Sequence, residues 1–402
     1  MFVSLYLDTI NGKIKGYNET VNQFDIAAEV NDLSVFGEAK KKGKDLYFEN
    51  GKIVEKDAYS DEKAAVGERL GKELSRLKEE RREILSSAVC GAGKSRDIYE
   101  EADKVYDKIL RVEKQLKDLR LERKRQAQSR LMREISETDY KYYCSICLII
   151  RDENEYLQEW LEWHISQGIE HFYIYDHGSK QSVKEFLKTL DKSVSDKVTV
   201  TDFGGRHNLA QYEAYNDCLR RFQKESRWIG FIDSDEFVNV KGGKSMRELL
   251  KDYEAYAGVF ARWVVYNANG LKEKTDAPCR ERFTSVYKGI ESRDMGKIFV
   301  QSALISYMMI HNGYTKAELE VVDEHKRPLS DGGLFVENAT TDFICINHYY
   351  TKSYEEWVEK ISRGSCDPFY SRKYDEFFDY NPDMEYCREE IFPVQEYEVS
   401  KK

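Results

Sequence analysis

The stretch Trp228–Val238, WIGFIDSDEFV, decides how the rest of the chain is interpreted. An apolar run leads into Asp233, Ser234, Asp235 and Glu236, and apolar residues follow. Strands buried in parallel sheets have continuous apolar runs of this kind. Three carboxylates in four positions at the end of such a strand are costly to bury unless a positive charge lies beside them. The stretch therefore predicts the end of a buried strand and a binding site for something positive.

Length and composition indicate two or three domains with a substantial core. The 402 residues are 41% hydrophobic and 13% aromatic, and the formal net charge is −10. The acidic balance argues against a general nucleic-acid binder, and no run approaches the ~18 apolar residues of a membrane span. The eight cysteines are scattered, most of them inside apolar segments, which fits a reducing compartment. We expect a cytoplasmic protein, with peripheral membrane contact left open.

Three regions of the chain differ in their pattern. Residues 1–60 are β-rich, with hairpin turn signals at Asn11-Gly12 and Asn50-Gly51, and predict a small β-rich domain of unknown role. Residues 61–136 are rich in charged residues and leucine, with apolar residues at heptad spacing. They predict a helical hairpin or coiled coil, folded on itself or forming a homo-oligomer, and residues 137–402 form the third domain. The heptad positions are Val105, Ile109, Val112, Leu116 and Leu119.

Strand and helix patterns alternate from about Tyr140 onward. Short apolar segments are separated by amphipathic helical segments, an order that predicts a Rossmann-like, mostly parallel α/β sheet with right-handed crossovers. The expected strands are 142–150, 171–176, 197–203 and 228–233, and the expected helices are 155–167, 182–190 and 208–224.

Acidic residues follow all four predicted strands, in the segments that begin at Arg151, Asp176, Asp202 and Asp233. The carboxyl ends of parallel strands meet along one edge of a sheet, and ligands bind there. Paired Asp residues at such an edge suit Mg²⁺ or Mn²⁺, which prefer oxygen ligands and keep positions open for phosphate oxygens. A metal in that position neutralises charge on a diphosphate leaving group.

The order of several motifs carries a resemblance to a known family. The motifs are RDENEYLQEWLEWH (151–164), GIEHFYIYDHGS (168–179), QYEAYNDC (211–218), FIDSDEF (231–237), RWVVYNANG (262–270), ERF (281–283), Lys297, and INHYYTKSY (346–354) with the EEWVEKISRG that follows. Together they resemble glycosyltransferase family 92 and its family 2-like relatives, over roughly residues 141–366. The resemblance implies a GT-A fold with a DXD motif, a nucleotide-sugar donor and a divalent metal.

The resemblance also implies roles on the donor side of the site. Asp176 would hold the uracil or ribose part of the nucleotide, and Arg151 and Glu153 would line the same pocket. Asp233 would face the ribose or a metal-bound water, and Asp235 would bind the metal.

Further roles fall on the later motifs. His311 and His348 are candidates for another metal ligand, with a packed core histidine as the alternative for each. Lys297 would suit the charge of the diphosphate, with an ordinary surface lysine as the alternative. Trp263 and Asn269 would face the acceptor, because sugars stack on aromatic rings and the glycine turn at Asn269 allows close approach; core packing is the alternative for Trp263.

The resemblance implies a metal-dependent hexosyltransferase-like enzyme of polysaccharide biosynthesis. It would move a sugar from a UDP-sugar to a saccharide or glycan-precursor acceptor, with inversion. A carboxylate base would deprotonate the acceptor, and the candidates are Glu236, Glu291 and Asp294. Two alternatives stay open: a sugar-nucleotide nucleotidyltransferase, disfavoured by the glycine-free loop 151–155, and a non-catalytic saccharide-binding assembly protein. The sequence does not identify the donor sugar, acceptor, linkage or oligomeric state.

Overall fold

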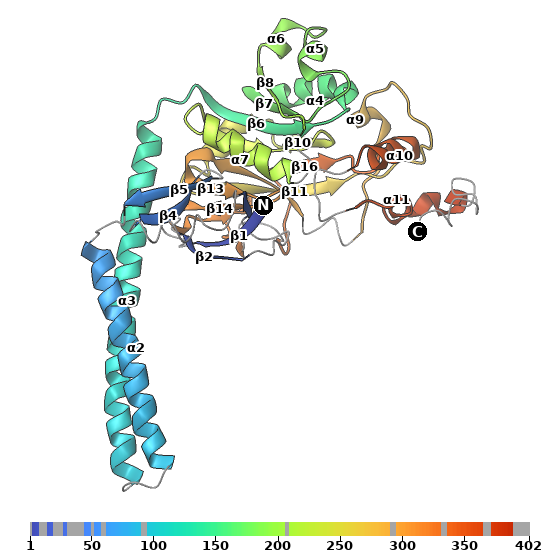
Figure 1. Ribbon diagram of the computed structural model, residues 1–402. Helices are drawn as coiled ribbons and strands as arrows, with labels where there is room; N and C mark the ends of the chain where they lie inside the picture. The colour runs from blue at the N-terminus through green and yellow to red at the C-terminus, as the bar shows by residue number, and fades with distance from the viewer. Residues whose placement is uncertain are drawn as a thin grey trace.

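The computed structural model describes a mixed α/β protein with a large sheet and a long helical pair that projects from it (Figure 1). The predicted fold class is confirmed. The described residues are 2–7, 14–18, 27–29, 44–49, 52–57, 62–89, 95–205, 209–289, 295–330, 336–364 and 371–388.

Short antiparallel strands make up the described part of the first 60 residues. Strand β1 (Phe2–Leu7) lies between β2 (Ile14–Asn18) and β3 (Ala27–Glu29), and β4 (Lys44–Glu49) pairs with β5 (Lys52–Asp57). The two Asn-Gly turns lie outside the described residues, but an antiparallel pair flanks each of them. The β-rich character of this segment is as predicted.

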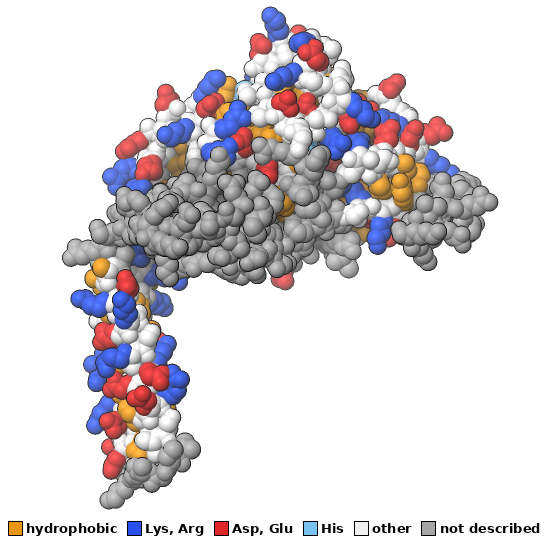
Figure 2. Space-filling view, in the orientation of Figure 1, with side chains coloured by type: hydrophobic (Ala, Val, Ile, Leu, Met, Phe, Trp, Pro, Cys, Tyr) orange, Lys and Arg blue, Asp and Glu red, His pale blue; other side chains and the backbone are white. Residues whose placement is uncertain are grey.

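Two long helices follow, α2 (Glu62–Val89) and α3 (Ser95–Glu137), and they run antiparallel to each other (Figure 1). Their apolar stripes face each other inside one chain, because heptad spacing places those residues on one side of each helix. The outer surface carries mixed acidic and basic side chains (Figure 2), as expected of a solvated pair. The buried residues of the shared core are Leu77, Val105, Ile109 and Val112.

The carboxyl-terminal part of α3 is attached to the sheet domain. Arg120 pairs with Glu318, and Gln128 Nε2 donates to the carbonyl oxygen of Ala317 at 3.0 Å. Ile135 near the end of α3 is buried in a core that it shares with the sheet. The rest of the helical pair extends away from the domain (Figure 1). Among the described residues, no helix is both long and apolar enough to cross a bilayer.

One sheet organises the chain after residue 141. The strand order is β10-β16-β11-β12-β9-β6-β7-β8, with β15 paired to β11. The four predicted strands form the parallel part, β9-β6-β7-β8, and β12 and β10 run opposite to the others on this path. The strands are β6 (Tyr142–Ile150), β7 (His171–Asp176), β8 (Val198–Asp202), β9 (Ser226–Phe231), β10 (Glu236–Val240), β11 (Gly258–Val265), β12 (Gly296–Gln301), β15 (Val321–Val322) and β16 (Ile344–His348).

Helices cover both faces of this sheet. Helix α4 (Asn154–Ser166) packs into the core on one face and α7 (Ala210–Phe222) into the core on the other. Both were predicted, to within two residues at each end. The remaining elements are α5 (Val183–Leu187), α6 (Lys192–Ser195), α8 (Met246–Lys251), α9 (Cys279–Arg282), α10 (Tyr354–Arg363), α11 (Glu376–Tyr380), the hairpin β13 (Ile305–Met308) and β14 (Gly313–Thr315), and 3₁₀ turns at 302–304, 316–318 and 382–387.

The strand directions create one edge where polar loops converge. Strands β6 to β9, β11 and β16 end at this edge, and the antiparallel strands β10 and β12 begin there. Residues that follow the first group and residues that start the second therefore meet, although they are far apart in the sequence.

Candidate functional site

Trp160 of α4 holds the loop after β9 in place through two hydrogen bonds. The Trp160 indole Nε1 donates to the carbonyl oxygens of Asp233 and Glu236, at 3.0 and 2.8 Å. The Glu236 carboxylate accepts the Asp233 N–H at 2.9 Å. Strand β9 also approaches β12 closely, since a Cβ on Gly230 would lie 2.3 Å from the Phe299 ring. The sequence thus places three carboxylates on a tightly held turn.

Asp233 uses both of its carboxylate oxygens within the protein. Oδ2 accepts from Lys297 Nζ at 2.9 Å, and Oδ1 accepts from Gln211 Nε2 at 2.9 Å and from the Tyr215 hydroxyl at 3.0 Å. Burial opposes ionisation, but the Lys297 charge holds the pKa of Asp233 below its ordinary value. Lys297 itself is fully buried, so the surface-lysine alternative is wrong. In this arrangement its charge neutralises Asp233.

Asp235 is paired with residues more than a hundred positions further along the chain. Lys360 Nζ donates to Asp235 Oδ2 at 2.6 Å, and His348 Nε2 lies 3.6 Å from the same oxygen. Burial opposes ionisation, but the Lys360 charge holds the pKa of Asp235 well below its ordinary value. Burial also lowers the pKa of His348, so its imidazole is neutral near pH 7. An ionised carboxylate beside a neutral imidazole is a donor set that binds divalent metals.

The four predicted metal ligands therefore differ in their surroundings. Asp235 and His348 lie together, and His348 Nδ1 has no hydrogen-bond partner among the described residues. Asp233 already has three partners. His311 is half-buried, with Nδ1 3.3 Å from the Gly296 carbonyl oxygen, and its partial burial lowers its pKa to about 3. Asp235 and His348 thus fit a metal best.

Trp263, a predicted acceptor residue, lies between the two histidines. Its ring centroid is 5.2 Å from that of His311 and 4.4 Å from that of His348. Its indole nitrogen has no hydrogen-bond partner in the described part of the chain. The other predicted acceptor residue, Asn269, adopts a left-handed φ of 53° and its side chain contacts Ser285 and the Arg282 carbonyl oxygen.

Glu153 follows β6 and lies against the same loop. Its Oε2 accepts from the Ser234 hydroxyl, and its Oε1 accepts from Arg363 of α10. Lys352 Nζ lies 3.8 Å from Oε1 and 3.3 Å above the centre of the Tyr156 ring. The loop after β6 is thus joined to the loop after β9 and to α10 by polar and charged groups.

The other two predicted donor-side residues lie differently. Both Asp176 oxygens accept backbone N–H groups, from Ser179 and Val183, each at 2.9 Å. Asp176 therefore holds the loop after β7 and the start of α5. Arg151 is exposed, and none of the described residues pairs with it. Their predicted nucleotide contacts stay predictions.

The three candidates for the catalytic base differ in what the structure describes of them. Glu236 is fully buried, burial raises its pKa well above its ordinary value, and Oε1 has no partner among the described residues. A base must touch the acceptor hydroxyl, so full burial disfavours Glu236, and its assignment stays a prediction. Glu291 and Asp294 lie outside the described residues, and their assignment stays a prediction.

Sequence reasoning missed the positive half of this site. Lys352, Lys360 and Arg363 were quoted within matching motifs, but no role was given to them. Lys360 and Arg363 are three positions apart on α10 and so share one face of the helix. Gln211 and Tyr215 of α7 were missed in the same way, although their spacing of four also places them on one face. Helical spacing was the signal that could have identified all four.

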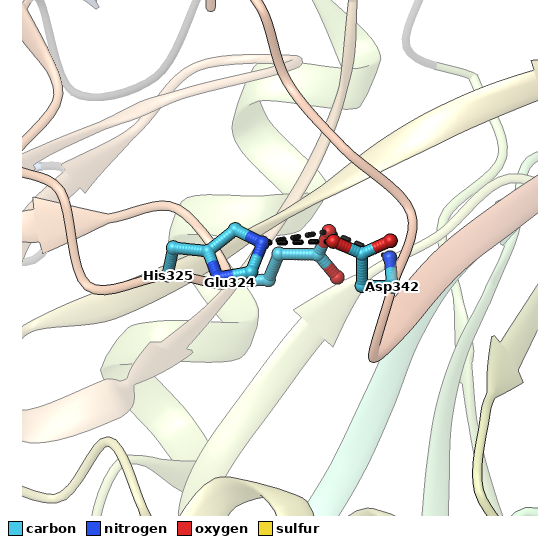
Figure 3. Close-up of side chains that lie close together, drawn as sticks. All are labelled: Glu324, His325 and Asp342. Carbon is cyan, nitrogen blue, oxygen red and sulfur yellow. Dashed lines mark hydrogen bonds and ion pairs between the residues drawn. The ribbon is translucent and has the colours of Figure 1, made fainter.

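A second acidic cluster lies elsewhere, where Glu324, His325 and Asp342 meet (Figure 3). It is the only group of three potential metal ligands found within the described residues. Glu324 is buried, and its two oxygens accept from Thr340 Oγ1 and from the backbone N–H groups of residues 342–344. His325 Nε2 lies 2.9 Å from Asp342 Oδ2. Because Glu324 is already saturated by hydrogen bonds, we interpret this cluster as a structural support for β16.

The largely parallel sheet and the acidic loop at its carboxyl edge define a GT-A-like fold. The family model described as Glycosyltransferase family 92 matches residues 141–375, more than half of the chain, and the chain belongs to that family. The resemblance seen in the sequence is confirmed.

Individual relatives match over shorter stretches. A glycosyltransferase family 92 protein of Oryza sativa subsp. japonica is 30% identical over 108 residues, which are 27% of this chain and 18% of the relative. Galactan beta-1,4-galactosyltransferase GALS2 of Arabidopsis thaliana is 30% identical over 177 residues, 42% of this chain and 33% of the relative. GALS3 of the same organism is 30% identical over 129 residues, 29% of this chain and 25% of the relative. The chain therefore spans a third or less of the length of these relatives.

Proposed function

We propose that this protein is a metal-dependent glycosyltransferase that moves a sugar from a UDP-sugar to a saccharide or glycan-precursor acceptor. Family membership supports the reaction class. The observation that carries the site is the pairing of Asp235 with His348 at the carboxyl edge of the sheet. Because several relatives are named galactan beta-1,4-galactosyltransferases, UDP-galactose is the first donor to test.

Asp235 and His348 would hold the cation, Mn²⁺ or Mg²⁺. A bound ion supplies neutralisation of the charge that develops on a departing diphosphate. The protein supplies the rest of the arrangement. Trp160 and Glu236 hold the loop in place, and Lys297 keeps Asp233 ionised.

Asp233 would bind the ribose of the donor. Its side chain is 31% exposed, and Lys297, Gln211 and Tyr215 fix the direction of its carboxylate. Fixed acceptors of this kind bind a hydroxyl with little loss of side-chain entropy. Inversion would require a carboxylate base at the acceptor hydroxyl, and Glu291 and Asp294 are the candidates.

The test is a thermal-shift and transfer assay on the full chain and on Asp235→Ala. UDP, GDP, CMP and UDP-sugars are each added with and without Mn²⁺. Binding to the folded state stabilises it by mass action, by about 2.7 kcal/mol at a ligand concentration 100 times Kd. We expect a metal-dependent shift with UDP, and transfer from one UDP-sugar, both lost in Asp235→Ala.

Asp342→Ala is the matched control. Asp342 is an exposed acid in the only group of three potential metal ligands among the described residues, away from Asp235, so its loss should leave the UDP response unchanged. No shift with any nucleotide, or equal shifts with and without metal, would contradict the proposal. Loss of the response in Asp342→Ala alone would move the metal site to the Glu324 cluster.

A further inference from the structure

The segment around α10 brings positive charge onto the acids of two separate loops. Lys360 pairs with Asp235 of the loop after β9, and Arg363 pairs with Glu153 of the loop after β6. Lys352, just before α10, lies 3.8 Å from the same Glu153. Three cations therefore face two carboxylates, and the charges of both acids are already balanced from within before any ligand binds.

We infer that Lys360 is a diphosphate-binding residue that also acts as the internal counterion of Asp235, so that a divalent metal and a diphosphate bind cooperatively. This inference rests on the proposed function, which supplies the diphosphate in the form of a nucleotide sugar.

The metal alone meets an unfavourable site. Lys360 Nζ lies 2.6 Å from Asp235 Oδ2, in the place where a cation ligated by that oxygen would approach. Both groups are nearly buried, with side-chain exposures of 11% and 8%, so their charges are poorly screened by water. A second cation at Asp235 would therefore be repelled by Lys360, and by Lys352 and Arg363 nearby.

A diphosphate removes this repulsion. An ammonium has three donors, and two of those on Lys360 are used, by Asp235 Oδ2 and by the Tyr350 carbonyl oxygen at 2.7 Å. The Tyr350 ring, 4.4 Å from Nζ, supports the charge from one side. The third donor is therefore available to a phosphate oxygen. Once the anion is present, the Lys360 ammonium pairs with the phosphate, and the Asp235 carboxylate becomes free to bind the metal.

The metal site and the diphosphate site are coupled, because a ligand bound at one site raises the affinity of the other site for its own ligand. If a diphosphate raises the affinity for the metal by some factor, the metal raises the affinity for the diphosphate by the same factor. A purely structural ion pair between α10 and the loop predicts something different, because its removal would weaken or leave unchanged both binding events.

The experiment compares the full chain with Lys360→Met, which keeps most of the apolar stem and removes the charge. Free Mn²⁺ is measured by its electron paramagnetic resonance signal, and binding of UDP and inorganic pyrophosphate is measured by calorimetry with and without Mn²⁺. Lys274→Met is the matched control, because Lys274 also pairs with two acids, Glu155 and Glu359, and one of them is on α10. Circular dichroism and Lys360→Arg, which keeps the charge, check that the variant is folded.

We expect Lys360→Met to change the affinities for Mn²⁺ and for UDP in opposite directions. Lys360→Met should bind Mn²⁺ alone about 5-fold more tightly and bind UDP in the presence of Mn²⁺ about 10- to 100-fold more weakly, since a charge-assisted hydrogen bond is lost. Lys360→Arg should lie near the parent protein, and Lys274→Met should change neither value. Equal weakening of both binding events, or no change in either, overturns the inference.

Failure of the inference differs from failure of the proposed function. If UDP binds with Mn²⁺ but Lys360→Met shows no opposite effects, the proposed function stands and the inference is wrong. If no nucleotide binds but pyrophosphate with Mn²⁺ does so in a Lys360-dependent way, the inference stands and the nucleotide-sugar donor is wrong.

Discussion

Glu356→Gln should destabilise the sheet domain strongly, and in a pH-dependent manner. Glu356 at the start of α10 is 3% exposed. It accepts two bonds from the Arg282 guanidinium, at 2.7 and 2.9 Å, and one from the Tyr156 hydroxyl at 2.7 Å. It also completes the capping box with Ser353. The amide would leave the buried Arg282 charge without its counterion.

The magnitude follows from the pKa of Glu356. Burial opposes ionisation, but Arg282, Ser353 and Tyr156 lower the pKa from 4.5 to about 2. A shift of this size corresponds to about 3 kcal/mol of stability at pH 7. Breaking a buried ion pair typically costs about 3–5 kcal/mol, which agrees. Since the folded pKa is depressed, this contribution is fully present above about pH 4.5 and is lost as the pH falls toward 2.

Urea denaturation followed by tryptophan fluorescence is the assay. All five tryptophans lie between residues 160 and 357, so the signal reports the sheet domain and is insensitive to the helical pair. We expect Glu356→Gln to lower the free energy of unfolding by about 3–5 kcal/mol at pH 7. The difference in free energy of unfolding between the variant and the parent protein should narrow between pH 5 and pH 3.

Glu359→Gln is the control on the same helix. Glu359 pairs with Lys274 at the surface, where its side chain is 43% exposed, so its loss should cost less than about 1 kcal/mol. Two results would refute the reasoning: a loss in Glu356→Gln no larger than in Glu359→Gln, or a gap that stays constant as the pH falls.

Three further substitutions test other parts of the structure. Lys297→Met should lower the free energy of unfolding by about 2–4 kcal/mol at pH 7, at the lower end for a buried pair because Asp233 reaches solvent; a loss under about 1 kcal/mol in urea denaturation would contradict this. Leu77→Ala should lower the free energy of unfolding of the helical pair by about 2–4 kcal/mol. Far-ultraviolet circular dichroism should show this loss, while the unfolding curve followed by tryptophan fluorescence stays unchanged. Gly230→Ala should cost about 1–3 kcal/mol because its Cβ meets the Phe299 ring, and adding Phe299→Leu should recover part of that loss in the same assay.

The parallel half of the sheet could be predicted because each of its strands and helices has a recognisable pattern within a short stretch of the sequence. Each strand there is a continuous apolar run, and each connection is an amphipathic helix, as in 142–176. The other half, β10, β11, β12 and β16, was not predicted as a sheet. Its partners are distant, since β16 pairs with β11 and with β10, and short strands separated by long loops carry no sequence signal of their register.

The acids of the site were predictable for the same reason, and their partners were not. Asp233 and Asp235 follow a recognisable strand, so their place on the sheet edge follows from topology. The ammonium that faces Asp235 lies 125 positions later, and no local pattern connects the two. Asp176 shows what topology alone leaves out: both of its oxygens accept N–H groups of its own loop, a structural role that the sequence did not indicate, and its predicted nucleotide contact stays a prediction.

The ion pairs at the sheet edge connect stability to function. Lys297 of the antiparallel half holds Asp233 of the parallel half, and Lys360 of α10 holds Asp235. A buried pair gains little net free energy over apolar packing, although losing one partner is costly. These charges therefore do not improve packing. They keep the two carboxylates ionised, and under the proposed function a metal and an anion would replace the internal partners without leaving an unpaired charge.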